Sequence, residues 1–171
     1  MLQREVEYST RFTQKEESMK HYIKPFIFCT TLLAVTSVQA IPNIWGSEFG
    51  QGMLANSIQN EQGDTFTINC DLGFSENGSL TGVDFTLTSG ENLSPSDSNS
   101  LEVLINGNAY WVPASLGWRN GDNAWYSFRE AIQSAAQFDV YVNKKKVASF
   151  APTPQSTQKV LGDLSDCEYR Y

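Results

Sequence analysis

Residues 101–112 read LEVLINGNAYWV, two short apolar runs joined by the dipeptide Asn106-Gly107. Asn-Gly suits a two-residue type I′ turn, because both central residues of that turn need positive φ angles. The residue pattern on either side predicts an antiparallel hairpin in which Leu101 lies opposite Val112. This hairpin is the clearest local signal in the chain, and it predicts a fold built from antiparallel strands.

Further strands are predicted upstream of this hairpin. Residues 52–58 and 64–71 form two arms around a turn at 59–63, and Asn77-Gly78 leads into a strand over 80–88. The apolar residues of that last strand are Leu80, Val83, Phe85 and Leu87. Two segments lack a period: 41–51 is interpreted as extended chain, and 89–100 as a mobile surface loop with nothing that can pack.

The second half of the chain adds two predicted helices and one more hairpin. A main helix is expected over 123–136, capped by Asp122 or Asn123. Its apolar positions recur at helical spacing and are Trp125, Phe128, Ile132 and Ala135. Strands at 138–142 and 147–150 surround a turn at 143–146, and Ser156 caps a short helix over 156–164. The sequence therefore predicts one α+β domain over 41–171, with antiparallel hairpins that form a sheet or small sandwich.

The first 40 residues are interpreted as a targeting segment. Lys20 and Lys24 follow the start codon candidate Met19, an apolar stretch covers 25–38, and Ala40 supplies the small residue that a signal peptidase requires. We expect a signal peptide at 19–40 with cleavage after Ala40, and we interpret 1–18 as a mis-called or extended N-terminus. No later segment approaches the roughly 20 apolar residues of a membrane span, so no stable anchor is expected after cleavage.

The charge balance is acidic and becomes more so when the leader is removed. The chain holds 19 acidic and 12 basic residues. Residues 1–40 contain four of the acidic and five of the basic ones, which leaves a net charge of −8 for residues 41–171. Such a surface repels nucleic acid and anionic membranes and attracts cationic proteins.

Cysteine usage points to an oxidising compartment. Cys29 belongs to the predicted leader, which leaves Cys70 and Cys167 as an even pair in the mature chain. An even pair in an exported protein predicts one disulfide. The bridge closes a loop of about 100 residues and is worth about 4 kcal/mol in the chain-entropy model.

Several kinds of catalysis are excluded by the residues that the mature chain lacks. Its only histidine, His21, lies in the predicted leader. Residues 41–171 therefore offer no Ser-His-Asp or Cys-His arrangement and no histidine for a zinc site. No Walker or dinucleotide-binding motif is present either. We therefore expect no catalytic residues, no metal and no cofactor.

The residues between the central hairpin and the main helix are the best candidates for binding. Trp118, Arg119 and Asp122 fall in a short Gly-containing segment, and Trp and Arg are the residue types that dominate interface hot spots. By contrast, we expect Trp125 to be core and Trp111 to pack on a sheet face. Residues 144–146, three consecutive lysines, are interpreted as a solvated hairpin tip.

Together these features favour an exported, non-catalytic binding protein in the periplasm or outside the cell. The most plausible role is an inhibitor or immunity-type partner of a cationic protein such as a cell-wall hydrolase. Two alternatives stay open. One is a structural or adhesin subunit of the envelope, and the other is a glycan hydrolase that uses carboxylates alone. The carboxylates considered for that hydrolase are Asp84, Glu102, Asp122 and Glu130.

The leader assignment makes a direct prediction. Expression of the full chain in a Gram-negative host should yield a periplasmic protein whose N-terminus, by sequencing and intact mass, is Ile41. The variant Ala40→Glu lacks the small residue before the cleavage point and should not be cut there. A cytoplasmic product that keeps residues 1–40 would contradict the assignment.

Overall fold

The computed structural model describes residues 41–73 and 80–168. The predicted signal peptide at 19–40, the preceding residues 1–18 and the Asn77-Gly78 turn lie outside the described residues. Within the described ranges, no helix has the length and apolar character needed to cross a membrane.

In the described part of the chain, eight strands form two antiparallel four-stranded sheets. The first sheet has the order β1-β2-β3-β4, with bounds Gly46–Gly50, Met53–Gln59, Thr65–Asp71 and Gly82–Thr86. The second sheet has the order β6-β5-β7-β8, in which β5 is Leu101–Ile105, β6 is Asn108–Val112, β7 is Phe138–Val142 and β8 is Lys145–Phe150. The predicted α+β fold of antiparallel hairpins is confirmed.

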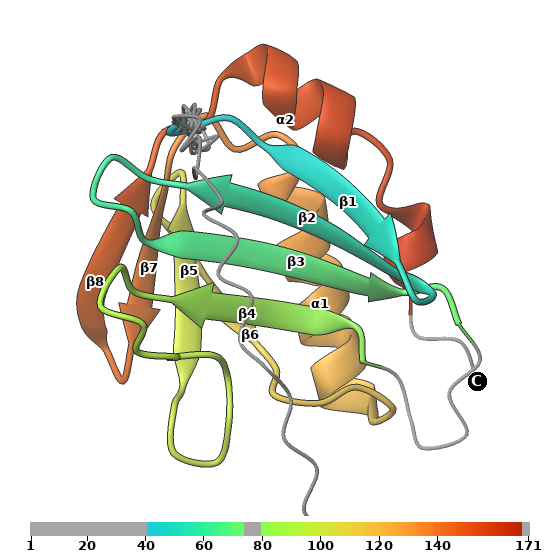
Figure 1. Ribbon diagram of the computed structural model, residues 1–171. Helices are drawn as coiled ribbons and strands as arrows, with labels where there is room; N and C mark the ends of the chain where they lie inside the picture. Colours follow the sequence, from blue (N-terminus) through green and yellow to red (C-terminus); the bar gives the residue numbers. More distant parts are fainter. Residues whose placement is uncertain (1–40, 74–79, 169–171) are drawn as a thin grey trace, which may run out of the picture. The chain divides into compact units, whose positions relative to one another are not determined.

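The helices complete the layer that faces the first sheet. Helix α1 (Arg119–Ile132) lies behind the first sheet and packs mainly against β6, at the edge of the second sheet (Figure 1). Helix α2 (Pro154–Leu161) follows β8 and is succeeded by a single 3₁₀ turn over Ser165–Cys167. One layer is thus the first sheet, and the other is the second sheet together with α1.

The core between the layers is centred on Phe66 of β3, which is fully buried. Its ring lies 5.3–6.5 Å, between centroids, from the rings of Trp45, Phe85, Phe128, Phe138 and Phe150. These rings come from the first sheet, from α1, from the second sheet and from the segment before β1. A single side chain therefore contacts every layer of the domain.

The 101–112 hairpin has the predicted register, with Leu101 opposite Val112. Asn106 and Gly107 both have positive φ, 52° and 81°, as a type I′ turn requires.

The segment 41–51 was predicted only as extended, but its second half is β1, which pairs with β2. The preceding Trp45 is buried in the core and anchors β1 at the sheet edge.

The loop after β4 is more ordered than the sequence predicts. Asn92 forms a bridge with Thr86, and the Leu93 side chain packs against the core. The expectation that nothing in 89–100 can pack was wrong, because Leu93 packs against the core and its N–H donates to the Phe85 carbonyl at 2.8 Å. Leu80, predicted to line the apolar side of its strand, is instead exposed.

The main helix was predicted over 123–136 but spans Arg119–Ile132. It begins earlier because the Trp118 carbonyl already accepts the Asp122 N–H at 2.9 Å. It ends earlier because the amides of Ser134 and Ala135 bond to carbonyls three residues back, which tightens the last turn.

The C-terminal helix was predicted over 156–164 with Ser156 as the cap. It runs instead over Pro154–Leu161, because the Thr153 hydroxyl accepts the Ser156 N–H and Pro154 supplies the first helical residue. Residues 162–164, which were predicted as helical, instead connect α2 to the 3₁₀ turn.

The predicted four-residue turn at 143–146 is shorter in the structure. Asn143 and Lys144 form the turn with positive φ angles, and β8 begins at Lys145. Lys146 is therefore a strand residue, and its ammonium lies 2.9 Å from the Asp139 carboxylate. Burial acts to raise the pKa of Asp139, but hydrogen bonds from Lys146 and Ser149 and the charge of Lys146 together outweigh it and hold that pKa below its usual value.

The C-terminal tail is fixed to the core by covalent and polar contacts. Cys70 of β3 and Cys167 form the predicted disulfide, which confirms the pairing. The Trp125 indole donates to the Cys167 carbonyl at 2.7 Å. Arg129, almost fully buried, donates to the Leu164 carbonyl and forms an ion pair with Glu168 at 2.8 Å.

Removal of the disulfide should therefore cost substantial stability. The double variant Cys70→Ala/Cys167→Ala is expected to lose about 4 kcal/mol of unfolding free energy, because the bridge closes a loop of 97 residues. Denaturant titration measures the loss, and the wild-type protein under reducing conditions should match the variant. A loss below about 1 kcal/mol in both would contradict the stabilising role.

Candidate binding surface

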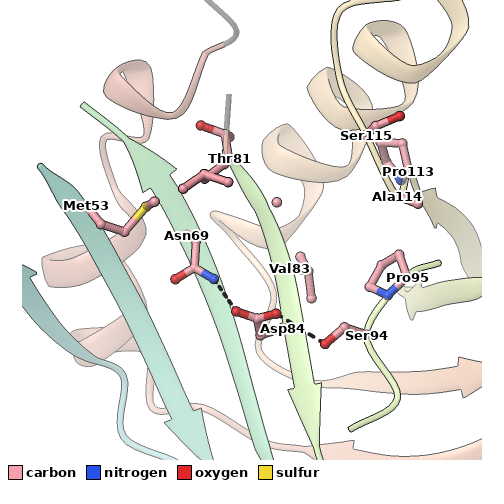
Figure 2. A pocket seen from close by; sticks show the side chains of 12 residues that line it. Met53, Asn69, Thr81, Val83, Asp84, Ser94, Pro95, Pro113, Ala114 and Ser115 are labelled. Atoms are coloured by element: carbon pink, nitrogen blue, oxygen red, sulfur yellow. Dashed lines mark hydrogen bonds between the residues drawn. The ribbon is translucent and has the colours of Figure 1, made fainter. Parts of the chain in front are cut away.

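A pocket of about 530 Å³ lies at the β4 edge of the first sheet. Its residues come from the outer face of that sheet, from the loop after β4 and from the connection between β6 and α1. They are Met53, Asn69, Leu80, Thr81, Gly82, Val83, Asp84, Ser94, Pro95, Pro113, Ala114 and Ser115. Figure 2 shows Met53 and Asn69 on one side of β4, with Pro95 and the 113–115 segment across the strand from them.

Of the residues that the structure describes, Asp84 is the one carboxylate that lines this pocket, and neutral groups hold it in place. The Asn69 amide donates to its Oδ2 at 2.6 Å, and the Ser94 hydroxyl donates to its Oδ1 at 3.2 Å (Figure 2). The side chain is exposed. Among the described residues, no lysine or arginine forms an ion pair with it. The pocket therefore presents a fixed negative charge without a cation from the described chain.

The edge of β4 is covered along only part of its length. The Phe85 N–H donates to the Ser94 hydroxyl at 2.9 Å, and the Phe85 carbonyl accepts the Leu93 N–H at 2.8 Å. The backbone of Phe85 thus points away from β3. Because backbone direction alternates along a strand, the N–H and carbonyl of Val83 point to the same side as those of Phe85. Val83 is 6% exposed and is one of the residues that line the pocket.

Two tryptophans form an exposed pair next to the pocket. Trp111 of β6 and Trp118 are 38% and 46% exposed, and their ring centroids are 6.0 Å apart with planes at 66°. The Trp118 indole N–H donates to the Ser115 carbonyl at 3.1 Å. Ser115 also lines the pocket, so the hydrogen bond to Ser115 connects the aromatic pair to the pocket wall.

Of the three candidate binding residues predicted from the sequence, two are exposed at the start of α1 and one bonds back to the preceding loop. Trp118 is the residue before α1, and Arg119 is the first helical residue and exposed. Asp122 turns back, and its carboxylate accepts the Gly117 N–H at 2.8 Å. It therefore holds the chain reversal before the helix. Trp125 is core, as predicted.

The four carboxylates considered for glycan hydrolysis are not collected in this pocket, because only Asp84 lines it. In the described part of the chain, no group of three or more His, Cys, Asp or Glu side chains is arranged to hold a metal ion.

Sequence reasoning missed the pocket, because its walls come from segments that are distant in the sequence. It also missed the role of Gly121, a buried residue of the first turn of α1. A Cβ atom there would lie 2.6 Å from Nε1 of Trp118 and 3.0 Å from the Ser115 carbonyl. The small residue at 121 lets the Trp118 ring lie on the helix. In the sequence, the Gly-Asp pair at 121–122 was the feature that could have indicated this close contact.

A double-mutant cycle tests this packing. In an ordinary helix Gly→Ala stabilises by roughly 0.5–1 kcal/mol, but Gly121→Ala should destabilise by about 1–2 kcal/mol because it displaces the Trp118 ring. In a Trp118→Ala background most of that cost should vanish, which gives a coupling energy of at least about 1 kcal/mol in denaturant titrations.

Gly50→Ala is the matched control for the cycle, because a Cβ at Gly50 would meet nothing within 4 Å. Additive effects of Gly121→Ala and Trp118→Ala would show that the Trp118 ring does not depend on Gly121.

Comparison with known proteins gives a consistent assignment. Residues 43–161 match the YfjT family. The chain is 41% identical to the uncharacterised protein YfjT of Escherichia coli strain K12 over 144 residues, which are 83% of this chain and 93% of that protein. It is 39% identical to the uncharacterised protein YkfB of the same strain, with the same coverage. No solved structure matches the chain. The chain therefore belongs to the YfjT family.

Proposed function

We propose that this protein is an exported, non-catalytic binding protein that attaches to a cationic protein, as an inhibitor or immunity-type partner. The observation that carries the proposal is the exposed Trp111–Trp118 pair beside a pocket with a fixed carboxylate. A cationic cell-wall hydrolase is the kind of partner that this chemistry suits.

The aromatic pair supports a protein partner. Tryptophan is enriched among hot-spot residues because its large flat ring buries much apolar area with few rotatable bonds. Trp118 and Trp111 stay substantially exposed, whereas the rings that surround Phe66 are buried. Burial of two adjacent exposed indole rings against a partner removes apolar area from water, which favours binding.

The charge of the chain supports a cationic partner. A net charge of −8 for residues 41–171 raises the association rate with a positively charged surface and opposes binding to acidic ones. The disulfide supports a location outside the reducing cytosol, where such bridges persist. Both features agree with the predicted leader and with a periplasmic or secreted protein.

The alternative of a glycan hydrolase that uses carboxylates alone has less support. Such an enzyme needs two carboxyl groups on either side of one glycosidic bond. Of the four candidates only Asp84 lines the pocket described above. The envelope-subunit alternative predicts self-association, which the experiment below also detects.

The proposal predicts a specific, salt-sensitive complex. The full chain, purified under oxidising conditions and immobilised, should retain a cationic envelope protein in stoichiometric amount at low salt and release it as salt rises. The variant Trp111→Ala/Trp118→Ala should bind that protein at least tenfold more weakly, which corresponds to about 1.4 kcal/mol.

Phe49→Ala is the matched control for this double variant, because Phe49 is 68% exposed on β1, the opposite edge strand of the first sheet. Circular dichroism confirms that each variant is folded. Equal loss in Phe49→Ala, a complex that ignores salt, or retention of only further copies of this chain would contradict the proposal.

A further inference from the structure

We propose that the pocket beside β4 binds a lysine or arginine side chain on an extended segment of the partner, and that this segment pairs with the free edge of β4 at Val83. The inference rests on the proposed function. It goes further by stating which structural element the partner presents and where it binds.

The charge of the pocket selects a basic side chain. An ionised carboxylate offers about four acceptor positions, and Asp84 uses one on each oxygen for Asn69 and Ser94. Asp84 lines the pocket, and no described lysine or arginine forms an ion pair with it. Because neutral donors already fix the carboxylate, a cation that binds there needs little reorganisation of the site.

The walls of the pocket suit the aliphatic stem of such a side chain. Lysine and arginine place their methylene groups on apolar surface and leave the charge at the polar end. Met53, Pro95 and Pro113 line the same pocket as Asp84 and provide apolar side chains there. A volume of about 530 Å³ is ample for one long side chain and part of its backbone.

The free part of the strand edge selects an extended backbone. The N–H and carbonyl of Phe85 point away from β3. Backbone direction repeats every second residue of a strand, so the N–H and carbonyl of Val83 point away from β3 as well. The segment 92–94 bonds to the backbone of Phe85, and Pro95, the next residue, lines the pocket together with Val83 and has no N–H to donate. An added strand gains two backbone hydrogen bonds at Val83, and side-chain pockets beside a strand edge supply specificity in this mode of binding.

The Asp84 carboxylate and the outward-facing backbone of Val83 can be contacted by one extended segment. Side chains directly opposite each other on paired strands lie on the same face, about 4.5–5.5 Å apart. The partner residue opposite Val83 therefore points toward the core side, and the residue opposite Asp84 points to the outer face, where the carboxylate lies. The partner segment should alternate an apolar residue opposite Val83 with a basic residue opposite Asp84.

A peptide titration tests this inference. The probe is Ac-Thr-Lys-Val-Lys-Thr-NH2, added to the ¹⁵N-labelled full chain purified under oxidising conditions. Amide shifts should centre on Val83 and Asp84, and Asp84→Asn should weaken binding at least tenfold. The matched control is Asp97→Asn, which removes an equal charge from an exposed position in the loop after β4.

Two further peptides separate charge from backbone pairing. The peptide with glutamate in place of lysine should not bind. The lysine peptide with an N-methylated valine loses the donor for the Val83 carbonyl and should bind at least tenfold more weakly. Equal weakening in Asp84→Asn and Asp97→Asn, or unchanged affinity of the N-methylated peptide, would overturn the inference.

The outcomes also separate this inference from the proposed function. If a cationic protein is captured through the tryptophan pair and Asp84→Asn leaves its affinity unchanged, the function stands and the pocket inference fails. If the peptide binds as described but no cationic protein is captured, the pocket inference stands and the function fails. Shifts at Val83 that grow with protein concentration, without peptide, would assign the edge to a second copy of this chain and overturn the inference.

Discussion

The packing of one ring, that of Phe66, holds the layers of this domain together. Phe66 belongs to β3, yet its ring contacts Phe128 of α1 and Phe138 and Phe150 of the second sheet. Since edge-to-face aromatic pairs favour particular orientations, these contacts restrict how the two sheets and α1 can be placed. The disulfide from Cys70, four residues later on the same strand, then ties the C-terminal tail to this centre.

The candidate binding surface is a consequence of that packing. With α1 and the second sheet held against one face of the first sheet, the connection between β6 and α1 passes beside β4 (Figure 1). The same connection carries the carbonyl of Ser115, which accepts the Trp118 indole N–H. The core thus places the aromatic pair, the fixed carboxylate and the β4 edge near the connection between β6 and α1.

Much of the fold was predictable because its signals are local. The Asn106-Gly107 turn and the stripe that includes Trp125 and Phe128 depend only on neighbouring residues, and both predictions are confirmed. The turn at Asn143-Lys144 was misplaced because a lysine with positive φ leaves no local mark. The start of α1 was misplaced because Asp122, a typical cap residue, bonds backward to Gly117 instead.

The pocket was beyond local reasoning, since it unites residues from β2 to the start of α1 that only the non-local arrangement brings together. Trp118 could be selected from its residue type, but its neighbour Trp111 could not, because their contact depends on how α1 packs on β6.

Hydrogen exchange of the complex with its captured partner tests the central claim most directly, because it maps the partner's footprint on the whole chain. Our account predicts that amide protection on binding is confined to residues 81–85 and 111–119. Protection located instead along β1 or β8, with these segments unchanged, would contradict it.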